Sequence, residues 1–539
     1  MKDIYWHLQM HLPEGKKGIE IDPKLMLQEP IPIIGTGEWS DKQCNDFKTM
    51  PVGSIVMVRK GNKPLALCEV TGENFNDSSL TNKYLNENFR QVKVLDFDTE
   101  NEASSLFSQG TLKPLYKSNN TESWNYINNW YKKILENMRI QEMTNLLEQK
   151  KQIIIQGAPG TGKTYSTASL ALSLLGISYD PTDHKDIMRL YQENVDKKHI
   201  YFTTFHQSMD YEDFIEGLKP EVVEGGIVYH VEDGIFKQIC NRAQSVVSDK
   251  DETNFETEIE TLKEKCIEEQ SKSSYVKLLT VTGAEFYVKF IDTKPSYFFV
   301  QPLNSQKLKE DPWYYVKIDD IFAYYSRSIK PKANSPYSIS ILKSLKLDST
   351  QQVSKEKKYI LIIDEINRGN ISKIFGELIT LLEADKRSSG THPLRVILPY
   401  SKQAFEVPSN LYIIGTMNTT DRSVGFIDYA VRRRFAFFTL GSSPDAIKSY
   451  YNSDPLGVIA LILFDKIKKF IELHKSPDLD IDDLMVGHSY FMAIDKKNLQ
   501  LKLDYEIIPL IREYDKDGII ALSEEERKKI GIEWKSILA

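Results

Sequence analysis

Eight consecutive residues of this sequence have the composition of a phosphate-binding loop. Residues 157–164 read Gly-Ala-Pro-Gly-Thr-Gly-Lys-Thr, and the run Ile153–Gln156 precedes them, so a buried strand leads into a helix. Glycines let backbone amides converge on a polyphosphate, while Lys163 neutralises the terminal phosphates and Thr164 offers a hydroxyl to Mg²⁺. A glycine-rich turn without a ligand would not explain Lys163 and Thr164. The residues predicted to bind a nucleotide are Gly157, Ala158, Pro159, Gly160, Thr161, Gly162, Lys163, Thr164 and Tyr165.

A second apolar run ends in two carboxylates. Ile360–Ile363 precede Asp364 and Glu365, as expected of a buried parallel strand whose carboxyl end lies where α/β sheets bind ligands. We predict that Asp364 holds Mg²⁺, mostly through water, and that Glu365 polarises the water that attacks the γ-phosphate. An isolated Asp-Glu pair is commonly a solvent-facing strand end. Its combination with the phosphate loop favours hydrolysis.

A third apolar run, Leu411–Met417, ends in Asn418. In a sheet beside the Asp364 strand, Asn418 is predicted to orient the same water or to sense the γ-phosphate, although alone it would more often cap a strand. Three consecutive arginines, Arg432–Arg434, follow at the end of a short helix. They favour a finger that reaches the γ-phosphate of a neighbouring subunit and stabilises charge in the transition state. Ion pairs within the subunit are the alternative for at least one of them.

Composition limits the class of protein. With 539 residues, the chain is expected to form about two to four domains. Its 41% hydrophobic and 27% charged residues are typical of a soluble globular protein. Because no apolar segment approaches ~18 residues and the N-terminus lacks a signal-peptide core, we expect a cytoplasmic protein without membrane contact. The net charge of −7 argues against a generally basic DNA-coating protein but leaves room for a local basic channel.

The elements that position the three runs are expected to form one α/β domain over residues 151–440. The α/β rhythm breaks between about 244 and 354, where a charged helix precedes aromatic-rich strands. Lys163 and Asp364 lie 364 − 163 = 201 positions apart, which is long for one nucleotide-binding core. Residues 244–354 are therefore predicted to be an inserted α+β subdomain. Its aromatic residues suggest either a sheet core or a nucleic-acid surface, and strand spacing favours the core.

Two further regions flank this domain. Residues 1–115 read as a β-rich, barrel-like module, with strands at Val52–Arg59 and Leu65–Val70 joined by a turn. Residues 116–150 are predicted to be a linker of one or two amphipathic helices, and residues 441–539 a helical lid.

Several strings in the right order resemble the McrB family, the AAA+ motors of modification-dependent restriction systems. The resemblance covers roughly residues 150–515 and implies an AAA+ P-loop fold, in which a parallel sheet with helices carries an α-helical lid. The strings that carry it are Gly157–Thr164, Phe205–Ser208, Tyr211–Phe214, Asp364–Arg368, Leu398–Ser401, Met417–Ser423 and Gly487–Phe491.

The resemblance implies GTP as the preferred nucleotide, with ATP as the alternative, together with Mg²⁺. It also implies a homo-oligomeric ring, expected to be hexameric, and a McrC-type nuclease partner that activates hydrolysis. Asn418 falls at the family's sensor position, with Asp421 and Arg422 in the signature beside it. Arg433 and Arg434 fall where the family's fingers lie.

The sequence departs from the family pattern at two places. Thr420 stands where the family usually has alanine, a small change that should not abolish nucleotide binding. More seriously, Gly487-His488-Ser489 offers no arginine where a typical AAA+ lid supplies one. His488 is either a contact to phosphate or base, or a structural residue of a lid turn.

The N-terminal module resembles the EVE/PUA-like β-barrel readers of modified bases. Short strings carry this likeness, namely Ile34–Trp39, Val52–Val56 and Ala66–Gly72. It implies that an extruded modified base lies in an aromatic cage, in which Trp39 is the first wall, with Trp6 and Phe75 behind it. An equal alternative is that Trp39 fills the barrel core. Arg59, Lys60 and Lys63 lie at one turn and are expected either to contact phosphates or to be an ordinary basic turn.

Together these readings predict a GTP-hydrolysing motor subunit of a McrBC-like complex. It would recognise modified double-stranded DNA and power translocation and cleavage by a partner nuclease. The alternative is an ATP-dependent remodelling or chaperone-type AAA+ protein whose N-terminal domain binds protein. An acidic cluster near residue 480 lacks the strand-borne carboxylates and lysine expected of a metal nuclease.

Overall fold

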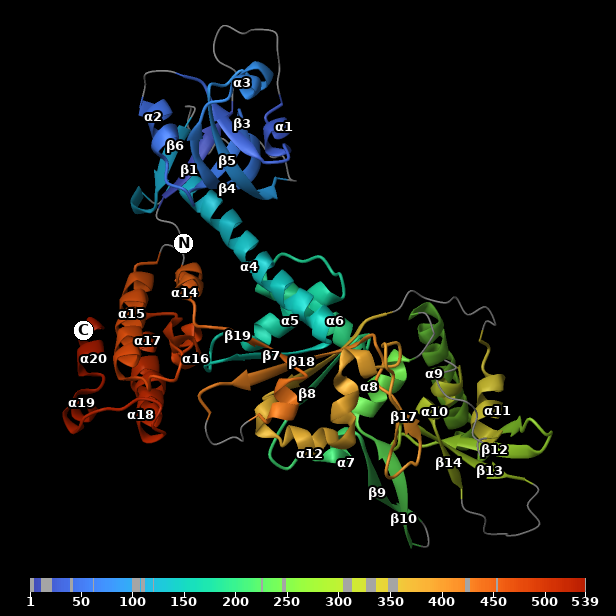
Figure 1. Ribbon diagram of the computed structural model, residues 1–539. Coiled ribbons are helices and arrows are strands. Elements are labelled where there is room, and N and C mark those ends of the chain that lie inside the picture. Colours follow the sequence, from blue (N-terminus) through green and yellow to red (C-terminus); the bar gives the residue numbers. More distant parts are fainter. Residues whose placement is uncertain are drawn as a thin grey trace. The chain divides into compact units, whose positions relative to one another are not determined.

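The chain forms two compact units, which we describe separately (Figure 1). The first comprises Met1–Glu142 with Asp180–Asp183, and the second comprises Met143–Tyr179 with His184–Ala539. The computed structural model describes residues 4–10, 22–38, 42–61, 63–98, 107, 112–119, 121–223, 226–244, 249–303, 313–325, 336–347, 357–421, 427–451 and 454–538. Within these ranges, no helix combines the length and the apolar character that crossing a membrane requires.

The first unit is built on a six-stranded mixed sheet in the order β2-β5-β4-β3-β1-β6. Its strands are β1 (Ile4–Gln9), β2 (Ile33–Thr36), β3 (Ile55–Lys60), β4 (Lys63–Phe75), β5 (Asn88–Phe97) and β6 (Leu112–Tyr116). Register shifts in the β4–β5 pairing increase the local twist, and the sheet curls into a half-barrel. The predicted β-rich, barrel-like fold is confirmed. Three short helices accompany the sheet: α1 (Lys24–Leu27), α2 (Lys42–Thr49) and α3 (Ser78–Tyr84).

The predicted linker is one continuous helix, α4 (Glu122–Lys150), of 29 residues. Its first turns bury Trp124, Ile127 and Ile134 against one side of the sheet, where Tyr5 and Leu67 complete an apolar cluster. A stripe of large apolar side chains at helical spacing explains why this segment forms a helix that packs on the sheet.

The second unit contains a five-stranded parallel sheet in the order β19-β7-β18-β15-β8. The strands are β7 (Gln152–Gly157), β8 (Ile200–Thr204), β15 (Tyr359–Asp364), β18 (Leu411–Asn418) and β19 (Ala436–Thr439). The central strands are apolar on both faces because helices cover both, and this explains their unbroken isoleucine runs. In the register of β18 with β7, Asn418 pairs with Gly157, and the predicted parallel sheet is confirmed.

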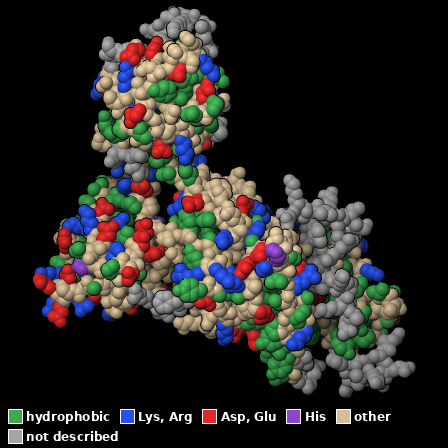
Figure 2. Space-filling view, in the orientation of Figure 1, with side chains coloured by type: hydrophobic (Ala, Val, Ile, Leu, Met, Phe, Trp, Pro, Cys, Tyr) green, Lys and Arg blue, Asp and Glu red, His purple; other side chains and the backbone are tan. Residues whose placement is uncertain are grey.

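Helices and short strands surround this sheet. They are α5 (Lys163–Leu174), α6 (His184–Asp196), α7 (Tyr211–Phe214), α8 (Ile235–Ala243), α12 (Ile371–Phe375), α13 (Tyr429–Arg432), β16 (Val396–Ile397) and β17 (Ala404–Phe405). A hairpin of β9 (Glu216–Val223) and β10 (Gly226–Asp233) projects between α7 and α8. Figure 2 shows hydrophobic side chains gathered on this hairpin, where Leu218, Ile227 and Tyr229 are exposed.

The insertion is an α+β subdomain, as predicted, with an antiparallel sheet in the order β11-β12-β13-β14. Its elements are α9 (Asp249–Ser271), β11 (Val276–Leu279), β12 (Glu285–Phe290), β13 (Tyr297–Pro302), β14 (Tyr314–Lys317), α10 (Ile318–Tyr325) and α11 (Pro336–Ser344). In Figure 1 the three helices lie on one side of the sheet, and they share its core.

The C-terminal region is a helical lid with its own core, as predicted. Its helices are α14 (Pro444–Tyr451), α15 (Leu456–His474), α16 (Ile481–Leu484), α17 (Lys496–Lys502), α18 (Ile508–Lys516), α19 (Glu524–Lys529) and α20 (Ile532–Ile537). Leu463, Ile467, Phe491 and Leu503 are buried at its centre. A separate core lets the lid move against the sheet as a body without losing its own packing.

Candidate nucleotide-binding site

The phosphate loop lies between β7 and α5 at the carboxyl edge of the sheet. Gly160 and Gly162 have φ of 78° and 82°, in the left-handed region that glycine adopts without a steric penalty. The Lys163 ammonium donates hydrogen bonds to the carbonyl oxygens of Gly157 at 3.0 Å and Ala158 at 2.9 Å. Lys163 therefore lies inside the loop, at the N-terminus of α5, where a polyphosphate is stabilised by backbone amides and the helix dipole.

The surroundings of Lys163 disfavour the protonated, positively charged form of its side chain. Burial lowers the pKa of Lys163 to about 8, and the nearby carboxylates of Glu365 and Asp364 only partly oppose this shift. A bound polyphosphate would supply the missing negative charge at close range and raise the pKa again. The loop is electrostatically suited to an anion.

A threonine that the sequence analysis missed holds the two carboxylate-bearing residues. The Thr416 hydroxyl donates to Asp364 Oδ1 and accepts from the Glu365 backbone N–H at 3.1 Å. One hydroxyl thus uses both its donor and an acceptor site. Thr416 stands two positions before Asn418 on β18, so both side chains point to the same face of the sheet. That spacing was the signal available in the sequence.

Both oxygens of Glu365 lie beside polar partners. Asn418 Nδ2 donates to Glu365 Oε1 at 2.7 Å, and Arg368 Nε lies 3.3 Å from Glu365 Oε2. Arg368 also reaches Asp421, with 3.3 Å between Nη2 and Oδ2. Glu365 has φ of 52°, a left-handed conformation that side chains with a Cβ rarely adopt and that is found at functional sites. Asp364, Glu365, Asn418 and Asp421 therefore belong to one network, with Thr416 and Arg368 between them.

Asn367 supports the same network from within the protein. It is buried, with 6% of its surface exposed, and its Nδ2 lies 3.5 Å from the Asn418 carbonyl oxygen. Among the described residues, its Oδ1 has no hydrogen-bond partner. Asn367 lies three positions after Asp364, within the Asp364–Arg368 string that carries the resemblance.

The arginines after α13 differ in exposure. Arg433 has 67% of its side chain exposed, and its Nη2 lies 3.2 Å from Glu383 Oε1. Arg434 is 5% exposed, pairs with the same Glu383 oxygen at 3.0 Å and donates to the Ala430 carbonyl at 2.8 Å. The exposed Arg432 lies over the Phe437 ring, 5.3 Å from its centroid. Of these three arginines, Arg432 and Arg433 have exposed side chains, and Arg422 lies outside the described residues.

The lid contacts the phosphate loop through its own backbone. Gly487 N–H donates to the Pro159 carbonyl at 3.1 Å, and Ser489 N–H donates to the Gly160 carbonyl at 3.2 Å. His488 Nδ1 accepts from Ser443 N–H at 3.4 Å, while its Nε2 lies 3.6 Å from the place where a Cβ on Gly162 would be. His488 therefore faces the predicted phosphate loop.

One lid carboxylate is poorly satisfied. The Thr419 hydroxyl donates to the backbone carbonyl of Asp483, and Asp483 Oδ1 is buried without a hydrogen-bond partner among the described residues. Burial raises the pKa of Asp483, and the neighbouring carboxylates of Asp480 and Asp482 raise it further. The acidic cluster of the lid thus adjoins the signature after β18.

The residues predicted to hold Mg²⁺ fit a hard cation that keeps several waters. Thr164 is exposed at the start of α5, and Asp364 ends β15 with its carboxylate fixed by Thr416. Among the residues that the structure describes, no group of three or more His, Cys, Asp or Glu side chains is placed to hold a metal. Mg²⁺ commonly binds one or two protein oxygens together with substrate phosphates, and these two side chains suit that mode.

The N-terminal unit corrects one prediction about DNA contacts. Arg59 is 1% exposed, because its Nε donates to His7 Nδ1 at 3.2 Å and its Nη1 to the Gly61 carbonyl at 2.5 Å. Its guanidinium therefore does not lie on the surface turn that we expected to meet phosphates. Lys60 is exposed, Trp6 packs partly buried against the sheet core, and Trp39 lies outside the described residues.

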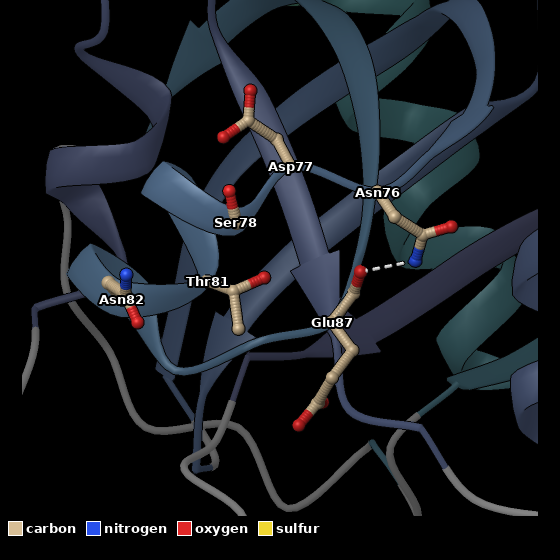
Figure 3. Close-up of a pocket in the computed structure, with 6 residues that line it drawn as sticks. All are labelled: Asn76, Asp77, Ser78, Thr81, Asn82 and Glu87. Atoms are coloured by element: carbon tan, nitrogen blue, oxygen red, sulfur yellow. Dashed lines mark hydrogen bonds between the residues drawn. The ribbon is translucent and has the colours of Figure 1, made fainter.

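Figure 3 shows a pocket of about 390 Å³ beside α3 of this unit. Asp77 caps α3 by accepting from the backbone N–H groups of Ser79 and Leu80. The lining residues are Asn76, Asp77, Ser78, Thr81, Asn82 and Glu87. These side chains are polar, and none of the predicted cage aromatics is among them.

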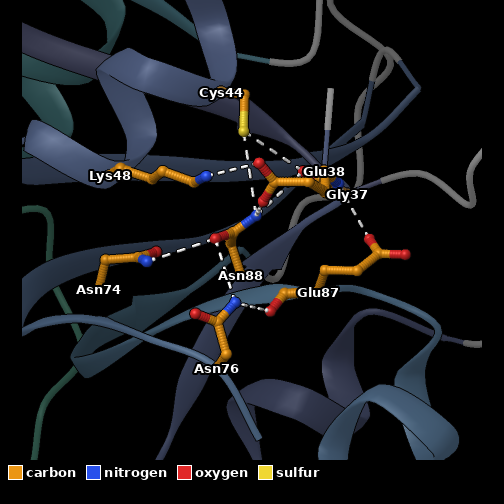
Figure 4. A network of polar contacts seen from close by, with 8 residues as sticks. All are labelled: Gly37, Glu38, Cys44, Lys48, Asn74, Asn76, Glu87 and Asn88. Carbon is orange, nitrogen blue, oxygen red and sulfur yellow. Dashed lines mark hydrogen bonds and ion pairs between the residues drawn. The ribbon is translucent and has the colours of Figure 1, made fainter. Parts of the chain in front are cut away.

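A buried amide next to this pocket organises a polar network (Figure 4). Asn88 is 0% exposed, donates to Glu38 Oε2 at 2.6 Å and accepts from Asn74 Nδ2 at 3.3 Å. Hydrogen bonds from Lys48 and Asn88 lower the pKa of Glu38. Asn76 joins the network and the pocket, since its Nδ2 donates to the Glu87 carbonyl at 2.6 Å. The sequence analysis missed Asn88.

Two family models match the second unit. An AAA domain of the dynein-related subfamily matches residues 323–435, and an McrB alpha-helical lid domain matches residues 462–518. The chain is 27% identical over 389 residues, 70% of its length, to the type IV methyl-directed restriction enzyme EcoKMcrB subunit of Escherichia coli (strain K12). It is 32% identical over 111 residues, 19% of its length, to the type II restriction enzyme BsuMI component YdiS of Bacillus subtilis (strain 168). The chain spans 56% of the first relative's length and 30% of the second's.

Solved structures with similarity are more distant. Human THYN1, in complex with 5-methylcytosine containing DNA, is 13% identical to this chain, with a TM-score of 0.17. The match covers 23% of this chain and 95% of the THYN1 chain. Protein Atu2648 from Agrobacterium tumefaciens is 14% identical to this chain, with a TM-score of 0.15. The match covers 21% of this chain and 86% of the Atu2648 chain. The family models, in contrast, fall on β15, β18 and α13, which carry the site, and on the lid.

Proposed function

We propose that this chain, which carries an McrB-family AAA domain with its helical lid, is the GTP-hydrolysing motor subunit of a modification-dependent restriction complex. The observation that carries the proposal is the meeting of Lys163, Glu365 and Asn418 at one edge of the parallel sheet, with Asn418 bound to Glu365 at 2.7 Å. The distant similarity to EcoKMcrB supports a restriction system as the setting of this hydrolysis.

Each residue of the site has a defined task in the proposed hydrolysis. The loop amides and Lys163 would bind the β- and γ-phosphates, and Thr164 and Asp364 are the residues that would hold Mg²⁺, which would supply charge neutralisation at the phosphates. Glu365 accepts a proton from the attacking water. Thr416 fixes Asp364 and the Glu365 backbone, so both carboxylates keep their positions as the nucleotide binds.

The attacking water must replace the hydrogen bond between Asn418 and Glu365. Glu365 Oε1 accepts from Asn418 in this structure, and Oε2 faces Arg368. We propose that Asn418 and Glu365 both hydrogen-bond the attacking water in the active state. Arg433 of a neighbouring subunit then compensates the negative charge that develops on the γ-phosphate. Both Arg433 and Arg434 pair with Glu383, but Arg433 suits this task because its side chain is 67% exposed, whereas that of Arg434 is 5% exposed.

The preference for GTP and the nuclease partner come from the family resemblance. The curated relative is described as a methyl-directed restriction enzyme subunit, which supports modified DNA as the substrate of the whole complex. We assign recognition of the modified base to the N-terminal half-barrel, where the exposed Glu38 carboxylate, held by the buried Asn88, provides an acceptor of the kind that reads a base edge. An ATP-dependent remodelling protein is the second candidate.

The decisive experiment measures GTP and ATP hydrolysis by the full chain, with and without a McrC-type nuclease subunit. We expect turnover of GTP over ATP and stimulation by the nuclease. Glu365→Gln should bind GTP as tightly as the wild type but lose at least ~100-fold in turnover, because it removes the base and keeps the hydrogen-bond geometry. A clear preference for ATP, or hydrolysis retained by Glu365→Gln, contradicts the proposal.

A further inference from the structure

The sheet of the insertion divides its aromatic residues between two faces. On β12 and β13, Phe286 and Phe298 are fully buried under the helices, whereas Tyr287 and Phe299 alternate to the other face and are partly exposed. Strand spacing alone favoured a core for all of them. The structure instead leaves half of these rings on a side that the three helices do not cover.

We call this side the aromatic face and define it by Tyr275, Tyr287, Lys289, Phe299 and Trp313. The Tyr275 ring centroid lies 5.7 Å from that of Tyr287 and 5.0 Å from that of Trp313. The Lys289 ammonium lies 4.1 Å from the Trp313 ring centroid and 5.9 Å from that of Phe299, its cross-strand partner. Rings and an ammonium group therefore alternate over neighbouring strands.

The net charge of the β11–β14 sheet is opposite in sign to that of the whole chain. The charged residues of its four strands are Lys277, Lys289, Lys317 and Glu285, so the sum is 3 − 1 = +2, against −7 for the whole chain. Lys277 is paired with Glu285 at 2.7 Å. Lys289 and Lys294 lie over rings of the aromatic face. A polyanion is favoured here in spite of the acidic composition of the protein.

The β9–β10 hairpin packs against β14 and so covers one end of the aromatic face. The Tyr315 ring on β14 lies 5.9 Å from the ring of His230 on β10, and Lys317 donates to the Val231 carbonyl at 3.2 Å. The part left for a ligand is therefore formed by β11, β12 and β13 with Trp313.

We propose that the aromatic face binds single-stranded DNA, with unpaired bases stacked on Tyr287, Phe299 and Trp313 and phosphates near Lys289 and Lys294. Rings on an open sheet interleaved with cations provide both terms that single-strand binding needs, because every base has a face to stack and every nucleotide a phosphate. Paired bases already stack within a duplex and do not offer those faces. This is a DNA contact on the motor itself, separate from the N-terminal unit, and it goes beyond the proposed function.

The test uses the full chain without nucleotide and a fluorescent oligo(dT) of about twelve nucleotides, within the range of such sites. Tyr287→Leu combined with Phe299→Leu keeps apolar bulk but removes the rings, and should weaken binding about tenfold or more in fluorescence anisotropy. Tyr314→Leu is the matched control: this tyrosine is 50% exposed, but β14 alternation places it on the side of the buried Val316. It should bind oligo(dT) as the wild type does.

Nucleotide hydrolysis should remain at the wild-type level in both variants, so failure of this inference is distinguishable from failure of the proposed function. Wild-type affinity in the double variant overturns the inference. Loss of ring assembly with retained oligo(dT) binding also overturns it, since the face would then be a subunit interface. So does tighter binding of oligo(U) than of oligo(dT).

A second measurement does not depend on the variants folding. Photo-cross-linking of the wild-type chain to bromouracil-containing oligo(dT), followed by mass spectrometry, should mark peptides that contain Tyr287, Phe299 or Trp313. Cross-links confined to other parts of the chain contradict the inference.

Discussion

At the scale of single residues, one threonine joins the two carboxylate-bearing residues of the site. Thr416 links Asp364 to the backbone of Glu365, so it positions the carboxylate proposed to hold Mg²⁺ and the proposed base together. Thr416→Val keeps the shape but removes the hydroxyl, and we expect turnover or apparent Mg²⁺ affinity to fall about 10- to 100-fold, as for other supporting ligands of a metal site. Thr416→Ser, which retains the hydroxyl, should restore activity. GTP hydrolysis across a Mg²⁺ titration measures both, and equal activity of the valine and serine variants contradicts the role.

His7 makes the N-terminal unit sensitive to acid. Burial, followed by the charges of Arg59 and Lys113, lowers the pKa of His7 to about 4 from its usual 6.5. The folded state therefore favours neutral His7, and stability that is complete above pH 6.5 is lost as pH falls toward 4. We expect a loss of about 2 kcal/mol between pH 7.5 and 5. Denaturant unfolding of the full chain across this range measures it, and His7→Gln should flatten the slope in that interval. An unchanged slope would exclude His7 as the source.

At the scale of elements, the sequence predicted what local patterns determine. Runs such as Ile360–Ile363 mark buried parallel strands, and their polar ends bring Asp364 and Asn418 to one edge whatever the loops between them do. Side-chain burial depends instead on partners far along the chain. Arg59 is buried because His7 accepts from it, and Arg434 because Glu383 pairs with it. No local sequence pattern predicts such long-range pairs. Arg59 and Arg434, which we expected at the surface, are therefore buried.

The contact between lid and phosphate loop yields a prediction at the same scale. A Cβ on Gly487 would lie 2.1 Å from Gly160 C and 2.2 Å from Pro159 O, and both of these are backbone atoms that cannot give way easily. Gly487→Ala should therefore push the lid off the loop and weaken binding of a fluorescent GTP analogue at least ~10-fold, since small misplacements at such sites are costly. Ser489→Ala keeps the backbone N–H bonded to Gly160 and should bind normally. Because the lid has its own core, thermal unfolding should change little in either variant. Normal GTP binding by Gly487→Ala would show that this docking is dispensable.

At the scale of the whole molecule, one active site is proposed to use two copies of the chain. Lys163 and Glu365 belong to the subunit that binds nucleotide, whereas the exposed Arg433 would act on its neighbour. Lys163→Ala and Arg433→Ala should each lower turnover by at least ~1,000-fold, the lower end of the range for an arginine finger. Mixing the two variants should restore part of the activity, because some interfaces then join an intact loop to an intact arginine. Arg432→Ala is the matched control, since its guanidinium lies over Phe437, and it should hydrolyse GTP like the wild type. If the mixture is no more active than either variant alone while still assembling, Arg433 does not act across the subunit interface.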